Sequence, residues 1–101
     1  MSYYVGMEVA EEDSPQITWN LGKMLHIALG RKGWIRCIEN LTGSQAQPLL
    51  EEAIAWMEMF PAGHKRFNPQ NGSGTYDMAL EFLKELLAMS KKYPDGIFYV
   101  H

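Results

Sequence analysis

The stretch from Tyr76 to Lys92 constrains the fold most, because its apolar residues gather on one broad face of an α-helix. A face of this width has to be buried against two neighbouring elements or against another subunit. The rest of the chain must therefore supply elements that cover this helix. Its apolar residues are Tyr76, Ala79, Leu80, Leu83, Leu86 and Leu87, extended by Met78, Phe82 and Met89.

A second helix is predicted upstream, ending before Pro61. Ser44 and Gln47 match the spacing of a capping box, in which two side chains satisfy the first free backbone amides of a helix. Pro48 is then acceptable in the first turn. The expected apolar stripe contains Leu50, Ala53, Ile54, Met57 and Phe60, widened by Leu49 and Trp56.

A broken helix is expected earlier in the chain. Asn20 is a good N-cap for a helix that begins at Leu21, and Gly30 is a candidate C-cap. A short helical piece then follows from Trp34 to Leu41. The glycines between the two pieces explain why the helix does not continue.

Three segments have strand composition: residues 2–10, residues 16–19 and residues 97–100. The second of these can instead be an extended approach to the first helix. A terminal strand of four residues needs a partner, and the N-terminal strand is the expected one. The predicted fold is therefore α+β, a single domain over residues 1–101, with a two- or three-stranded antiparallel sheet, two main helices and one broken helix.

Composition narrows the function classes. The net charge of -3 argues against non-specific nucleic-acid binding, and the single cysteine, Cys37, excludes an intramolecular disulfide. The first residues do not form a secretion signal, and no stretch is long and apolar enough to span a membrane. We therefore expect a cytoplasmic protein without a membrane partner.

The polar loop at residues 61–77 carries the densest recognition chemistry in the chain. It combines cations, amide side chains and glycines, and it runs into the start of a helix, where free N–H groups attract anions. These features indicate a site for a phosphate-bearing ligand. The candidate ligand-binding residues are Lys65, Arg66, Asn68, Asn71, Gly72, Ser73, Gly74, Thr75 and Tyr76, with Trp19, Trp34 and Arg36 as further stacking or charged groups.

The same loop also has a purely structural interpretation. Asn68 to Gly72 is rich in turn-forming residues, and Lys65 and Arg66 can be solvated charges. A second basic group around Trp34 and Arg36 would strengthen the binding interpretation only if folding brought it beside the loop.

Catalytic and metal chemistry are not favoured by the sequence. The three histidines are widely spaced and match no metal-binding motif. Cys37 falls on an apolar stripe, and Ser73 lies outside any nucleophile elbow. We expect no catalytic residues, no metal and no cofactor, and a binding protein in preference to an enzyme.

Three segments resemble a group of small uncharacterised bacteriophage and prophage proteins: ITWNLGKML, NPQNGSGTYDMALEFLKELL and YPDGIFYV. The group combines a helix start after Asn, an NPxNGxGxY loop and a closing Pro-Asp turn with a strand. The resemblance covers most of the chain from Gln16 onward. Ser73 stands where the group has Trp in its NGWG form, so stacking by that residue is not expected here.

The resemblance implies a phage protein that acts on host defence, and the residues around the loop suggest how. The leading hypothesis is a homo-oligomeric protein that sequesters a phosphate-bearing, nucleotide-derived defence signal. One alternative is a protein–protein inhibitor of a host defence complex, whose acidic surface around Glu8 meets a basic host protein. A nucleotide-processing enzyme is the other.

Overall fold

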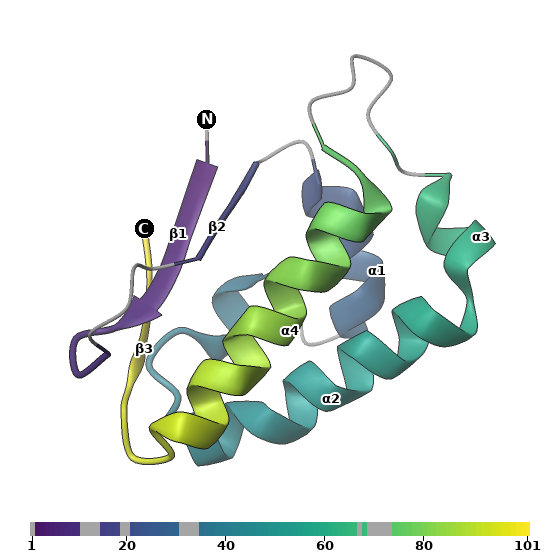
Figure 1. Cartoon of the computed structure of the whole chain (residues 1–101). Coiled ribbons are helices and arrows are strands. Elements are labelled where there is room, and N and C mark those ends of the chain that lie inside the picture. The colour runs from purple at the N-terminus through teal and green to yellow at the C-terminus, as the bar shows by residue number, and fades with distance from the viewer. Residues whose placement is uncertain (1, 11–14, 19–20, 31–34, 67, 69–73) are drawn as a thin grey trace.

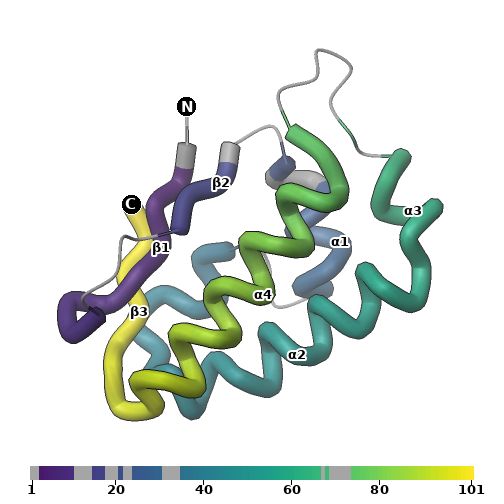
Figure 2. The backbone as a smooth tube through the Cα atoms, viewed as in Figure 1, coloured from purple at the N-terminus to yellow at the C-terminus, as the bar shows by residue number. Residues whose placement is uncertain are grey.

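The computed structural model describes residues 2–10, 15–18, 21–30, 35–66, 68 and 74–101 (Figures 1 and 2). It confirms the α+β fold with a three-stranded antiparallel sheet and helices packed beside it. The elements are β1 (Ser2–Met7), β2 (Gln16–Thr18), α1 (Gly22–Leu29), η3 (Ile35–Ile38), α2 (Gly43–Met59), α3 (Pro61–Lys65), α4 (Tyr76–Lys92) and β3 (Phe98–Val100).

The sheet has the order β2-β1-β3, so the first strand lies at its centre. Tyr3 is paired with Ile17, and Gly6 with Tyr99. The predicted pairing of the two terminal strands is therefore confirmed, although β1 ends three residues earlier than expected. One face of the sheet supplies core side chains from Val5, Met7, Ile17, Phe98 and Val100.

The helices cover that face of the sheet, with α2 and α4 forming the most extensive helix pair (Figure 2). The broad apolar face of α4 is buried inside one chain, between α2 and the sheet. Most of the width that suggested a subunit contact is thus buried within one molecule, while Met78 on the same predicted face is 51% exposed. The buried residues of α4 are Tyr76, Ala79, Phe82, Leu83, Leu86, Met89 and Ser90.

The broken helix is confirmed as α1 and η3. Gly30 ends α1 with a positive φ of 66°, a backbone conformation that glycine adopts without steric cost. The predicted N-cap Asn20 lies outside the described residues, as does Trp34.

The start of α2 corrects the predicted capping box. Thr42 and Gln45 form it, with the Gln45 amide donating to Thr42 Oγ1 at 3.2 Å and the Thr42 amide donating to Gln45 Oε1 at 2.9 Å. Gln47 instead donates to the carbonyl of Ser90 on α4 at 3.3 Å. The helix therefore starts earlier than expected, and Pro48 lies inside it.

Candidate functional site

The structure gathers part of the predicted ligand set where α3 ends and α4 begins (Figure 1). Lys65 and Arg66 end α3, a short helix that the sequence analysis took for loop. Proline at its first position favours such a helix, because its missing N–H needs no partner there. The predicted residues found at this junction are Lys65, Arg66, Asn68, Gly74, Thr75 and Tyr76, whereas Trp19, Trp34, Asn71, Gly72 and Ser73 lie outside the described residues.

Arg36 does not belong to this junction. It lies on η3, where its guanidinium contacts Glu39 at 3.2 Å and sits 5.8 Å from the centre of the Tyr3 ring. Arg36 therefore interacts with Glu39 and with Tyr3 of the sheet, and not with the α3–α4 junction.

The start of α4 uses some of its amides within the chain. Thr75 is its N-cap, accepting the Met78 amide at 3.2 Å, and Asn68 Oδ1 accepts the Tyr76 amide at 2.9 Å. Because these N–H groups already have partners, they do not face a ligand. Asn68 and Thr75 therefore cap the start of α4.

Tyr76 is a structural residue and not a stacking surface. Its side chain is only 7% exposed, and its hydroxyl donates to the carbonyl of Met57 at 2.5 Å. That carbonyl is near the end of α2, where Pro61 has no N–H to offer it. The hydroxyl therefore satisfies a buried acceptor and ties α4 to the corner between α2 and α3.

The local charge around Tyr76 is partly negative. Burial of the phenol, followed by the carboxylates of Glu58 and Asp77, raises the pKa of Tyr76 above its ordinary value of 10.0. The Lys65 ammonium lies 5.2 Å from the centre of the same ring and adds a positive charge beside these carboxylates. The junction is consequently of mixed charge.

His64 is a core residue. It is 2% exposed, and its Nδ1 lies 2.8 Å from the carbonyl of Phe60. Its Nε2 is buried and has no hydrogen-bond partner among the residues that the structure describes. The polar loop predicted at residues 61–77 includes His64, but the structure places this residue in α3 with its side chain buried.

Tyr76→Phe should lower the free energy of unfolding by about 1–2 kcal/mol, because it leaves the Met57 carbonyl buried without its donor. The expected fall in melting temperature is roughly 5–10 °C. Tyr4→Phe is the matched control, since Tyr4 is half exposed, and it should change stability by less than about 0.5 kcal/mol. Equal effects of the two variants in thermal melts would contradict the role of the Tyr76 hydroxyl.

The raised pKa of Tyr76 adds a pH dependence to the same comparison. The folded state holds this proton more tightly than the unfolded chain, so the stabilisation is complete below about pH 10. It is lost as pH rises through the folded-state pKa. Melts between pH 9 and 11 should therefore show a smaller alkaline loss of stability for Tyr76→Phe than for the parent chain.

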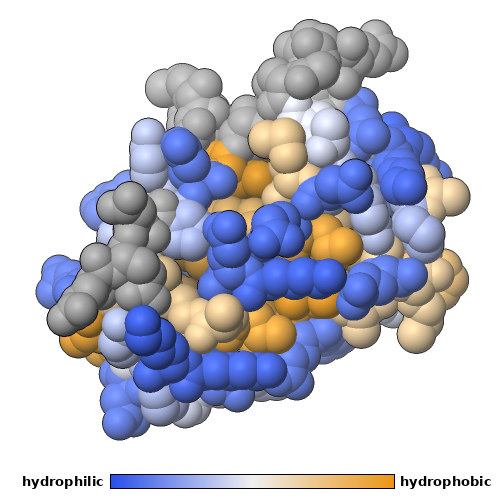
Figure 3. Space-filling view, in the orientation of Figure 1, coloured by the Kyte–Doolittle hydropathy of each residue, from blue (hydrophilic) through white to orange (hydrophobic). Residues whose placement is uncertain are grey.

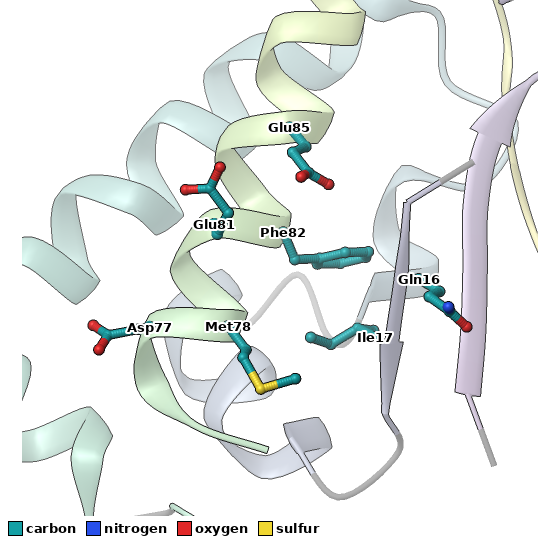
Figure 4. Close-up of a pocket in the computed structure, with 7 residues that line it drawn as sticks. All are labelled: Gln16, Ile17, Asp77, Met78, Glu81, Phe82 and Glu85. Carbon is teal, nitrogen blue, oxygen red and sulfur yellow. The ribbon is translucent and has the colours of Figure 1, made fainter. Parts of the chain in front are cut away.

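A groove of about 460 Å³ lies between β2 and the first half of α4 (Figure 4). Its floor is apolar: Ile17 and Phe82 point towards each other from the two elements, and Met78 extends the floor towards the start of the helix. Both Ile17 and Phe82 are 3% exposed, while Met78 is 51% exposed. The floor of the groove therefore consists of two buried side chains, Ile17 and Phe82, with the exposed and flexible side chain of Met78 beside them.

The rim of the groove is acidic. Asp77, Glu81 and Glu85 line it from α4; in Figure 4 the Glu85 side chain points to the β2 side of the helix, whereas those of Asp77 and Glu81 point to its other side. In the space-filling view, hydrophilic side chains over α4 are flanked by exposed apolar atoms (Figure 3). Within the described part of the chain, neither Glu81 nor Glu85 forms an ion pair.

This groove was missed by the sequence analysis. The four-residue spacing of Asp77, Glu81 and Glu85 was visible, but such a row ordinarily marks a solvated helix face. It lines a groove only because the sheet places β2 alongside α4. A second hollow, of about 390 Å³, lies beside β3 and also carries carboxylates, from Glu8 and Asp95.

Other chemistries find no support in the described part of the chain. It contains no group of three or more side chains arranged to hold a metal ion. No helix there has the length and apolar character needed to cross a membrane. Comparison with family models, curated proteins and solved structures gave no match.

Proposed function

We propose that the chain is a small protein-binding module whose groove between β2 and α4 holds a basic segment of a partner protein. The observation that carries the proposal is the combination of an apolar floor with carboxylates that have no cation of their own among the described residues. A lysine or arginine side chain suits this combination, because its stem covers apolar surface while its charged end reaches a carboxylate.

The charge pattern supports a cationic partner over an anionic one. Carboxylates line both the β2–α4 groove and the second hollow beside β3, and the whole chain carries a net charge of -3. Opposite charge on a partner speeds encounter and disfavours wrong partners. This is the protein–protein alternative of the sequence analysis, moved from the acidic surface around Glu8 to the β2–α4 groove. For a phage protein, the partner would be a host defence protein.

Capture of a phosphate-bearing nucleotide is the second candidate. Lys65 and Arg66 lie in sequence at the end of α3, close to the capped start of α4, and this specific arrangement favours it. The occupied amides of Tyr76 and Met78 and the nearby carboxylates of Glu58 and Asp77 count against it. A homo-oligomer is not needed for either candidate.

One titration separates the two candidates. The ¹⁵N-labelled protein is titrated with a capped lysine-rich nonapeptide, with a glutamate-rich peptide of equal length as control, and separately with ATP and cyclic nucleotides. We expect the lysine-rich peptide alone to shift the amide signals of Ile17, Phe82 and Glu85, with affinity that falls as salt is added.

The outcomes are distinct. No shift in the groove with basic peptides would overturn the proposed function. Nucleotide-induced shifts confined to Lys65, Arg66 and Thr75, and absent from a Lys65→Ala/Arg66→Ala variant of unchanged melting temperature, would establish the second candidate instead.

A further inference from the structure

The open edge of β2 is the starting point. The Val5 amide donates to the Pro15 carbonyl at 2.9 Å, which makes these two opposite residues a hydrogen-bonded pair of the ladder. Such pairs alternate along an antiparallel ladder, so the next one joins Tyr3 to Ile17. The backbone N–H and C=O groups of Gln16 and Thr18 therefore point away from β1.

The other side of β1 confirms this alternation. Tyr4, which lies opposite Gln16, exchanges both of its backbone bonds with His101, at 3.0 and 2.8 Å. Its amide and carbonyl thus face β3 and not β2. Among the described residues, no backbone group is bonded to the outward side of Gln16 or Thr18.

That outward side belongs to the groove. Gln16 and Ile17 line it, and β2 runs alongside α4 in the close-up (Figure 4). A chain that occupied the groove would meet free backbone donors and acceptors on one side and the carboxylates of α4 on the other.

We infer that the partner segment binds as an extended strand along β2, with basic residues at every second position; this inference rests on the proposed function. Addition of a strand to an exposed sheet edge is a general mode of peptide recognition, in which main-chain bonds give affinity and alternate side chains give specificity. The groove provides free backbone groups on β2 for the main-chain bonds and carboxylates on α4 for the side-chain specificity.

The position of Glu85 selects the pattern. Its side chain points to the β2 side of α4, whereas that of Glu81, four residues earlier, points to the other side of the helix (Figure 4). Every second side chain of a strand points to the same face, and two strand residues span about 6.6 Å. A strand with alternating lysines or arginines therefore keeps its charges on the face towards Glu85, whereas consecutive basic residues would turn half of their charges away.

Peptide pattern is the first test. A capped nonapeptide in which threonine and lysine alternate is compared with one of the same composition whose lysines are consecutive. We expect the alternating peptide to bind about ten times more tightly in the NMR titration. Methylating the amide nitrogens of one alternating set, the set that faces β2, should weaken its binding about five- to ten-fold, and methylating the other set should do so far less.

A backbone variant is the second test. Gln16→Pro removes the outward N–H, and proline is tolerated on an edge strand where that group faces outward. Its affinity for the alternating peptide should be about five-fold below that of Gln16→Ala, which lacks the same side chain but keeps the amide.

Each outcome decides a separate point. Equal binding of the two lysine patterns, or equal sensitivity to the two methylation sets, would overturn the strand inference while leaving the proposed function standing. Failure of every basic peptide to bind would overturn both. The methylation comparison uses the unmodified protein, so it stands even if Gln16→Pro does not fold.

Discussion

Gly43→Ala should lower the free energy of unfolding by about 3 kcal/mol, which corresponds to a fall in melting temperature of roughly 15 °C. A Cβ atom added at Gly43 would lie 2.6 Å from the carbonyl oxygen of Ser90 and 3.1 Å from the Cα of Pro94, and it would also collide with the carbonyl oxygen of Tyr93. All three atoms are backbone, so no side chain can rotate away. The chain must shift where α2 meets the end of α4.

That contact is also held by hydrogen bonds. The Gly43 amide donates to the Gly96 carbonyl at 2.8 Å, and the Ser44 amide donates to the Pro94 carbonyl at 2.9 Å. A shift of the backbone would weaken both bonds, and α2 and α4 are the main helix pair of the core. The effect should therefore appear as a loss of global stability in thermal and urea melts.

Gly63→Ala is the matched control. The nearest atom to an added Cβ there is the Cβ of Phe60 at 3.9 Å, and Gly63 lies inside α3. Alanine is a better helix former than glycine, so this variant should be neutral or more stable by up to about 1 kcal/mol. A Gly43→Ala variant as stable as Gly63→Ala would show that the α2–α4 junction is looser than its geometry indicates.

The steric demand at Gly43 illustrates what sequence patterns omit. Two overlapping pairs, Thr42 with Gln45 and Ser44 with Gln47, have the same capping-box spacing. Local propensity does not decide which of the two pairs caps the helix. The tertiary structure decides it, because the backbone at position 43 packs against the backbone of Ser90 and only glycine fits there. Elements whose evidence is local and periodic, such as α4, were predicted correctly.

Other errors came from side chains whose burial depends on tertiary neighbours. Trp56 and Phe60 were assigned to the apolar stripe of α2, yet each is about half exposed, and their rings are 5.1 Å apart. His64 falls within the predicted polar loop and is buried. In each case the residue type allows either environment, and the corner between α2 and α3 decides which one it has.

The candidate site was harder to predict than the fold. Its floor joins Ile17 to Phe82, residues far apart in the sequence, and neither carries distinctive chemistry. The row of carboxylates on α4 also has a cost, because like charges four residues apart destabilise a helix by about 0.2–0.5 kcal/mol for each pair. Among the described residues no ion pair to Glu81 or Glu85 offsets this repulsion, and a local rule broken in this way is typical of residues kept for binding.

The groove carboxylates lead to the second large effect. Glu81→Lys/Glu85→Lys should weaken binding of a lysine-rich peptide about thirty-fold, or ~2 kcal/mol, because two carboxylates that line the groove become cations. The fold should survive, since both side chains are exposed and make no ion pair within the described residues. The melting temperature is expected to stay within about 3 °C of the parent value.

A variant with the same net charge isolates the position of the charges. Glu51→Lys/Glu52→Lys also changes the net charge from -3 to +1, since each replacement adds two charges, but these residues lie on α2 and outside the groove. If general repulsion governed binding, both double variants would lose affinity equally. If the groove binds the peptide, the Glu51→Lys/Glu52→Lys variant should lose no more than about three-fold, and the lysine-rich peptide should still shift the signals of Ile17 and Phe82.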